Sequence, residues 1–272
     1  MKCYYFKEIN NEKGFLDNII DCTYIMLLEN SPREKNVFRQ LEEFVPSKKI
    51  IIQYNKGYKN CKKKLIKQSS NYDILDSYIT IFKHANSNHY DKILVLEDDF
   101  IFSKKIMEST IIHDIESLYK NYDVNLFNFG SPMTIYNPFF INYTRYNCNK
   151  LIFSFAAHSV IYSKKFRNKL IDYYDNNKIN YQIDLHFNSS FIDNIYTYKI
   201  PLAFQTFPET ENSKEWKIYN VNIFGAFQYV VSFFKINEKP EIGYNNLYLV
   251  LKIVNLIIYI IIVYTINQLF IQ

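Results

Sequence analysis

One stretch near the middle of the chain, Lys92 to Phe102, constrains the fold most strongly. It reads KILVLEDDFIF, so four aliphatic residues are followed by three carboxylates, Glu97, Asp98 and Asp99, and then by apolar residues again. An aliphatic run of this length is typical of a strand buried on both faces, as in a parallel sheet covered by helices. Three adjacent acids cannot continue inside such a core, because unpaired buried charge is costly. We therefore expect them at the carboxyl edge of the sheet, where open α/β folds bind ligands.

Carboxylate oxygens gathered at such an edge suit a hard divalent cation, Mn²⁺ or Mg²⁺. A bound diphosphate would supply the remaining ligands of the cation. The same acids can also be interpreted as a turn that caps the next helix. Acidic turns are common, whereas a buried strand that runs directly into three carboxylates is not, so we favour a functional site.

The composition is that of a globular protein. The chain has 272 residues, of which 48% are hydrophobic and 22% are charged, enough for one large α/β domain or two small ones. Its 32 basic and 27 acidic residues give a net charge of +5, which is too balanced for a dedicated nucleic-acid-binding protein. The lysines between Lys56 and Lys67 fit a solvated loop as well as a phosphate-binding or membrane-binding patch.

The four cysteines, Cys3, Cys22, Cys61 and Cys148, are widely scattered along the chain. They show neither a Cys-x-x-Cys spacing nor a nearby histidine, so we expect no zinc site and no disulfide framework. A reducing compartment is the simplest assumption for such a chain. The first 14 residues are polar and charged, which does not fit a signal peptide.

Strand and helix patterns alternate along most of the chain. Strands are expected at 21–28, 49–54, 92–97, 125–130, 154–162 and 196–204, and helices at 33–44, 73–85, 103–119 and 164–174. This alternation predicts an α/β domain at 21–217 with a mainly parallel central sheet, preceded by an N-terminal extension at 1–20. Residues 131–150 lack periodicity and predict a long functional loop. Residues 218–246 are expected to form a linker to the C-terminal segment.

The C-terminal segment, 247–271, is apolar on all faces and long enough to cross a membrane as a tail anchor. A single Asn255 is tolerable within it, and Lys252 could reach the membrane surface with its amine. Because Lys235 and Lys239 also precede the apolar run and no basic residue follows it, the positive-inside bias predicts a cytosolic domain. A helix packed against the domain and an interfacial helix are the alternatives.

Several short segments follow one another in the order and spacing found in a known enzyme family. They are residues 24–33, 76–99, 156–164 with 182–185, and 201–205 with Ser213. Together they resemble glycosyltransferase family 25, which contains lipooligosaccharide and collagen galactosyltransferases. The Leu-Glu-Asp-Asp sequence that ends at Asp99 is the most specific of these motifs. Two positions depart from the family pattern: Leu28-Glu29 stands where an Asn-Leu pair is common, and Tyr78 stands where a histidine is usual.

The resemblance implies a single GT-A-like domain that binds a nucleotide-sugar donor, such as a UDP-sugar. It also implies transfer of a hexose, galactose or glucose, with inversion, to a glycan, a glycoprotein or a lipid-linked acceptor. Such a transfer needs a cation, Mn²⁺ or Mg²⁺, to neutralise the departing diphosphate. It also needs a base that takes the proton from the acceptor hydroxyl.

We assign Glu97 and Asp99 as the metal ligands. Asp98, Arg33 and Gln205 are assigned to donor binding, with Asp98 at the ribose or sugar and Arg33 at the phosphates. A surface arginine at the start of a helix is the ordinary alternative for Arg33.

Asp184 is our first candidate for the catalytic base, and Glu209 follows it together with Glu211. Asp184 could equally be a helix cap. His158 could bond an acceptor hydroxyl, although a lone histidine on an apolar strand is often a core residue. His186 is a weaker candidate.

Two other functional classes remain open from the sequence. A non-catalytic relative could keep the fold as a membrane-tethered glycan-binding or scaffold protein. A phosphatase is less consistent, because such enzymes carry a nucleophilic aspartate after the first strand, where this chain has Glu29 and Asn30.

Overall fold

The structure is a computed structural model that describes residues 2–137, 145–155, 157–176, 194–207, 217–218, 221–222 and 224–271. Its centre is a nine-stranded sheet with the order β1-β3-β2-β4-β9-β6-β10-β8-β7. The strands of this sheet are β1 (Tyr4–Asn10), β2 (Cys22–Leu28), β3 (Lys49–Asn55), β4 (Lys92–Glu97), β6 (Leu126–Asn128), β7 (Met133–Tyr136), β8 (Cys148–Phe155), β9 (Ser159–Ser163) and β10 (Ile195–Tyr198).

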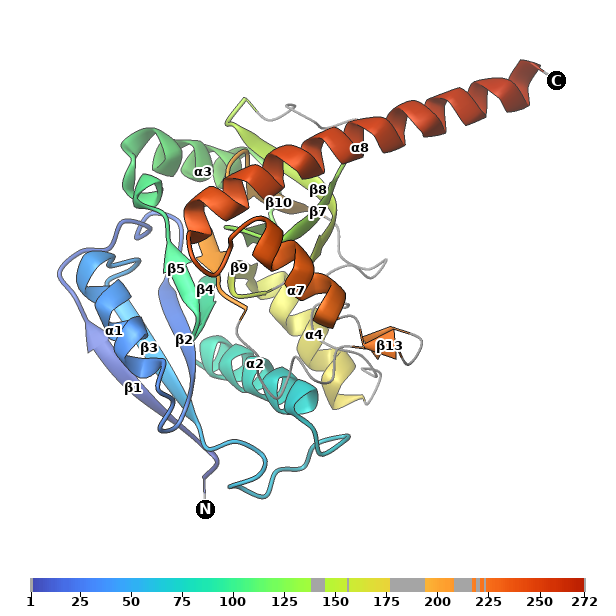
Figure 1. Ribbon diagram of the computed structural model, residues 1–272. Helices are drawn as coiled ribbons and strands as arrows, with labels where there is room; N and C mark the ends of the chain where they lie inside the picture. The colour runs from blue at the N-terminus through green and yellow to red at the C-terminus, as the bar shows by residue number, and fades with distance from the viewer. Residues whose placement is uncertain are drawn as a thin grey trace.

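Helices cover both faces of this sheet, and a long C-terminal helix extends away from the domain (Figure 1). The helices are α1 (Glu34–Glu43), α2 (Ser70–Ser87), η1 (Lys104–Met107), α3 (Ser109–Asn121), α4 (Lys164–Asp175), α7 (Phe224–Phe233) and α8 (Pro240–Ile271). Two short two-stranded sheets complete the described elements: β5 (Phe100–Phe102) with β11 (Ala203–Gln205), and β12 (Lys217–Ile218) with β13 (Val221–Asn222).

Strand β4 is buried on both faces, as its aliphatic sequence predicts. Leu94 and Leu96 pack in a core with residues of α1 and α3. Ile93 and Val95 point to the opposite face, into a core with residues of α2 and α4. Alternate residues of a strand face opposite sides of the sheet, so an all-aliphatic strand needs a helical layer on each side.

The sheet is mixed, and its parallel part lies where the acidic residues are. Strand β2 pairs in parallel with β3 and with β4, and β6 pairs in parallel with β10. Strands β1, β8 and β9 run opposite to the others. In the register of the sheet, Leu28 lies opposite Asn55, and Met26 lies opposite Glu97. The carboxyl ends of β3, β2 and β4 are therefore adjacent.

Three expected boundaries differ from the structure. Residues 1–20 are not a separate extension, because β1 pairs with β3 along the sheet edge and Leu16 is buried in the core. Strand β1 carries two adjacent charges, Lys7 and Glu8, and no residue of it is fully buried. Edge strands often have such sequences, which makes them hard to recognise. The expected loop at 131–150 contains β7 and the start of β8. The expected linker at 218–246 contains α7 and the start of α8.

The expectation of no disulfide is also wrong. Cys3 and Cys61 form one, with their Cα atoms 5.6 Å apart. Spacing could not predict it, because the pairing of β1 with β3 brings the N-terminus beside the loop after β3. Cys22 and Cys148 are free and buried.

Helix α8 is long and apolar enough to cross a membrane between Pro240 and Gln268. Its first part packs on the domain, where Tyr244, Leu247 and Tyr248 are buried. From Leu256 to Gln268 every residue is exposed except Tyr259, which is half-buried. The expected membrane helix and the alternative of a helix packed against the domain therefore occur in the same helix.

Candidate functional site

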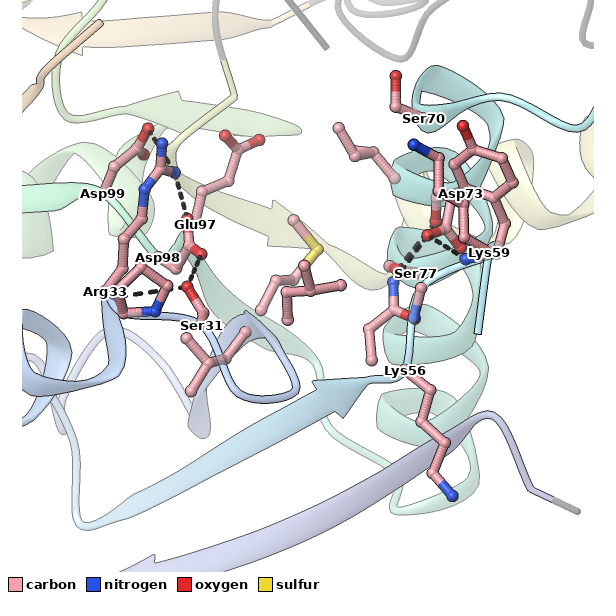
Figure 2. A pocket seen from close by; sticks show the side chains of 18 of the residues that line it. Ser31, Arg33, Lys56, Lys59, Ser70, Asp73, Ser77, Glu97, Asp98 and Asp99 are labelled. Carbon is pink, nitrogen blue, oxygen red and sulfur yellow. Dashed lines mark hydrogen bonds and ion pairs between the residues drawn. The ribbon is translucent and has the colours of Figure 1, made fainter. Parts of the chain in front are cut away.

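A cavity of about 570 Å³ lies at the carboxyl edge of β2, β3 and β4. It is lined by the turn after β2, the loop after β3, the first turns of α2, the end of β4 and the end of β11. Open α/β sheets bind ligands at this edge, because loops rather than strands meet there. Figure 2 shows two polar groups in the cavity, one that includes Arg33 and the acidic residues, and one around Asp73 and Ser77 of α2.

We call the first group the acidic wall: Ser31, Arg33, Glu97, Asp98, Asp99 and Gln205. Arg33 Nη1 lies 2.7 Å from Asp98 Oδ1 and 3.4 Å from Asp99 Oδ2. Ser31 Oγ donates a second hydrogen bond to Asp98, at 3.3 Å from Oδ2. The turn after β2 thus places one positive charge beside two of the acids that follow β4, because the two parallel strands end side by side.

Asp99 is the more deeply buried aspartate of the acidic wall. Its Oδ2 accepts a hydrogen bond from Gln205 Nε2 at 3.0 Å. Its Oδ1 is buried and has no hydrogen-bond partner among the described residues. Burial raises the pKa of Asp99 to about 6, while the positive charge of Arg33 opposes this shift. A desolvated carboxylate with an unpaired oxygen is a feature of functional sites.

Glu97 is held from the opposite side by α2. The hydroxyl of Tyr78 lies 2.8 Å from Glu97 Oε1 and 3.0 Å from the Ala157 carbonyl oxygen. Because the ring of Tyr78 is fully buried, its hydroxyl is a rigid donor to the carboxylate. Tyr78 therefore contacts the acidic wall through Glu97.

The second polar group, which we call the helix wall, is built around Asp73 of α2. The amine of Lys63 forms a buried ion pair with Asp73 and lies 2.6 Å from Asn55 Oδ1. Asn55 Nδ2 donates to Ser77 Oγ at 2.9 Å. Asn55 Oδ1 also accepts from the N–H of Gly57 at 2.7 Å, and the φ of Gly57 is +75°, which favours glycine. The loop after β3 is thereby pinned to α2.

The acidic wall does not form a ready-made metal site. In the part of the chain that the structure describes, no group of three or more histidine, cysteine, aspartate or glutamate residues is placed to hold a metal ion. Asp98 is occupied by Arg33 and Ser31, and Glu97 contacts Tyr78. Asp99 Oδ1 is buried and has no partner among the described residues. These residues fit a cation that takes one or two carboxylates from the protein and its other ligands from a diphosphate.

The other residues chosen from the sequence are placed as follows. Gln205 lies in the acidic wall through the pairing of β11 with β5, which sets Gln205 opposite Phe100. His158 is fully buried, and burial lowers its pKa to about 3, so its imidazole is neutral. Its backbone oxygen accepts a hydrogen bond from the N–H of Glu97 at 2.9 Å. The assignment of His158 to an acceptor hydroxyl stays a prediction.

The catalytic-base candidates Asp184 and Glu209 lie outside the described residues, as do Glu211, His186 and Ser213.

The helix wall has no recognisable signal in the sequence. Its lysine, Lys63, belongs to the lysine-rich run that fitted a solvated loop, yet it is 7% exposed. Burial lowers its pKa, and the bond to Asp73 opposes that shift. The sequence signal for Lys63 is Asp73, an aspartate ten residues later in the first turn of α2. Other lysines of the run lie at similar sequence distances from Asp73, so this signal does not single out Lys63.

Comparisons with known proteins add little to this geometry. No protein-family model matches the sequence, and a search of curated proteins gives no match. The chain is similar to a solved structure titled "Crystal Structure of A197 from STIV", with 10% sequence identity and a TM-score of 0.40. The alignment covers 69% of this chain and 85% of that chain. A likeness at this level supports no conclusion about fold or function.

Proposed function

We propose that the chain is a membrane-anchored glycosyltransferase with a GT-A-like domain. In this proposal it transfers a hexose, galactose or glucose, from a UDP-sugar to a glycan, a glycoprotein or a lipid-linked acceptor. The observation that carries the proposal is the acidic wall. In it an arginine and a buried carboxylate with an unpaired oxygen meet at the carboxyl edge of the parallel part of the sheet. The cavity has the volume of typical small-ligand sites, about 300–1,000 Å³.

The residues of the acidic wall have chemistry suited to a nucleoside diphosphate. The Arg33 guanidinium can bind a diphosphate through two parallel hydrogen bonds once it leaves Asp98 and Asp99. Asp99 Oδ1, with Glu97, would hold a Mn²⁺ or Mg²⁺ ion. When bound, that ion would neutralise charge on the departing nucleotide. Gln205 and Tyr78 would keep the two carboxylates in place, since each donates or can donate a hydrogen bond to one of them.

A non-catalytic glycan-binding or scaffold relative is the second candidate. The observation in its favour is that Arg33 already pairs with Asp98 and Asp99 within the protein. An acidic wall that is satisfied internally would not need a cation. The unpaired oxygen of Asp99 argues against this interpretation, because a purely structural cluster would be expected to satisfy it.

A thermal-shift screen of UDP-sugars with and without Mn²⁺ tests the proposal. We expect the full-length protein in detergent to be stabilised when donor and cation are both present, and to release the sugar slowly by hydrolysis. Stabilisation without hydrolysis or transfer would favour the scaffold. No stabilisation by a complete donor panel with metal present would refute the proposal. Asp99→Asn should abolish the stabilisation, whereas Asp175→Asn, a half-exposed aspartate paired with Lys83, should not.

A further inference from the structure

The C-terminal hairpin, which consists of α7, α8 and the residues between them, holds one side of the cavity. The hydroxyl of Tyr244 in α8 accepts a hydrogen bond from the backbone N–H of Gln205 at 3.2 Å. Asn237 Oδ1 accepts one from the N–H of Phe207 at 2.7 Å, and Gln228 Nε2 donates one to the carbonyl of Phe207 at 2.7 Å. Gln205 and Phe207 both line the cavity. Three side chains of the hairpin thus satisfy backbone groups of the cavity wall.

Apolar packing joins the same two parts of the molecule. Phe204 and Phe207 share one buried cluster with five hairpin residues, Val231, Ile236, Tyr244, Leu247 and Tyr248. The rings of Phe204 and Tyr244 have centroids 5.4 Å apart, and those of Phe207 and Phe227 are 4.8 Å apart. This cluster is distinct from the two cores beside the sheet. It exists because the hairpin folds back over β11.

The opposite side of β11 is also tightly packed. A Cβ atom on Gly130 would lie 1.9 Å from the carbonyl oxygen of Ala203. Strand β11 is therefore held between Gly130 and the hairpin. From this position Gln205 reaches Asp99 Oδ2 at 3.0 Å. Any shift of the Gln205 backbone would move the donor that orients Asp99.

Helix α8 continues from this contact towards the membrane-spanning part. Tyr248 and Asn255 bond the backbone of Ser131, Thr134 and Tyr136, so α8 also covers the β7 edge of the sheet. From Leu256 to Gln268 the helix is then exposed, apart from half-buried Tyr259. This stretch is about 20 Å long at ~1.5 Å per residue, which is shorter than the ~30 Å hydrocarbon core. One helix therefore runs from the cavity wall to the exposed apolar segment that is a candidate membrane span, and Figure 1 shows it extending away from the domain.

We propose that the membrane helix is a structural part of the binding site, in which Tyr244 is a positioning residue that holds Gln205, and through it Asp99, in the orientation that ligand binding requires. The identity of the ligand, a nucleoside diphosphate with a divalent cation, rests on the proposed function. The coupling between α8 and the cavity wall does not. The anchor therefore also shapes the site that it attaches to the membrane.

Tyr244→Phe tests this role, because it keeps the buried ring and removes the hydroxyl that contacts Gln205. Tyr264→Phe is the matched control, because Tyr264 is 64% exposed on the same helix. Backbone hydrogen exchange of the full-length protein in detergent reports on the contact without any ligand. We expect the Gln205 amide to exchange about five- to tenfold faster in Tyr244→Phe and to be unchanged in Tyr264→Phe.

The second measurement is the affinity of UDP with Mn²⁺. We expect Tyr244→Phe to weaken it about three- to tenfold, with a melting temperature close to that of the wild type. If the Gln205 amide exchanges at the wild-type rate in Tyr244→Phe, or if the affinity is unchanged, the positioning role is refuted. If the wild-type protein binds no nucleotide while the exchange rate still rises, the proposed function fails and the coupling between α8 and the cavity wall stands.

Discussion

Replacing Asp99 by asparagine tests whether the carboxylate of Asp99 serves ligand binding or the stability of the fold. Burial raises the pKa of Asp99 to about 6 from an ordinary value of 3.8. The folded protein therefore binds this proton more tightly than the unfolded chain does. Stability falls as the pH rises from about 4 to about 6, and above that window the charged Asp99 destabilises the fold by up to about 3 kcal/mol. Asparagine has the same shape and no charge to bury.

We therefore expect Asp99→Asn to have an equal or higher melting temperature at pH 7.5, and a smaller change in stability between pH 4 and pH 6. The value of about 3 kcal/mol is an upper limit, because asparagine weakens the 3.4 Å contact with Arg33. In the same variant, binding of UDP with Mn²⁺ should be lost. The measurement is thermal unfolding from pH 4 to pH 8, with Asp175→Asn as the surface control. A loss of more than about 2 kcal/mol at pH 7.5 would mean that the acidic wall is structural, and the reasoning from its unpaired oxygen would be wrong.

Three further predictions concern the rest of the fold and the C-terminal helix. Reducing the Cys3–Cys61 disulfide, which spans 58 residues, should lower the free energy of unfolding by about 4 kcal/mol. The melting temperature with and without a thiol reductant measures this loss. A disulfide that persists in native membranes would argue against a cytosolic domain. Deleting residues 260–272 should release the protein from membranes without a change in melting temperature, whereas deletion from Pro240 should also loosen the cavity wall. Membrane pelleting and thermal unfolding distinguish these outcomes. Unchanged pelleting after either deletion would refute the anchor. Arg167→Met should destabilise the protein by about 3 kcal/mol in thermal unfolding. The reason is that buried Arg167 donates to the carbonyls of Tyr162 and Tyr90 and to Asn86 Oδ1, which would lose this donor. No loss of stability would mean that water replaces the guanidinium.

The local sequence was sufficient to predict the helices and strands that depend only on their own hydrophobic pattern. The aliphatic run before Glu97 predicts a doubly covered strand and the emergence of charge at its end, because neither property depends on which strands are neighbours. Helix α2 and strand β3 follow from their own periodicity in the same way. The edge strands β1 and β7 do not, because a strand at a sheet edge needs few apolar residues and is stabilised by its partner.

The contacts within the site depend on residues that are far apart in the sequence. Arg33 meets Asp98 because β2 and β4 are parallel neighbours, and no spacing rule connects the two positions. Lys63 could be recognised as buried only after β1 and α2 had closed around it. Tyr244 contacts Gln205 because α8 folds back over β11.

The sequence by itself therefore determined that three carboxylates emerge from a buried strand, and that the chain ends in an apolar helix long enough to cross a membrane. Hydrophobicity and charge specify both features residue by residue. Only the tertiary structure decided which cation faces those carboxylates, which oxygen remains unpaired and where the apolar helix docks. These outcomes depend on strand order and on packing between distant segments, which a local pattern does not encode.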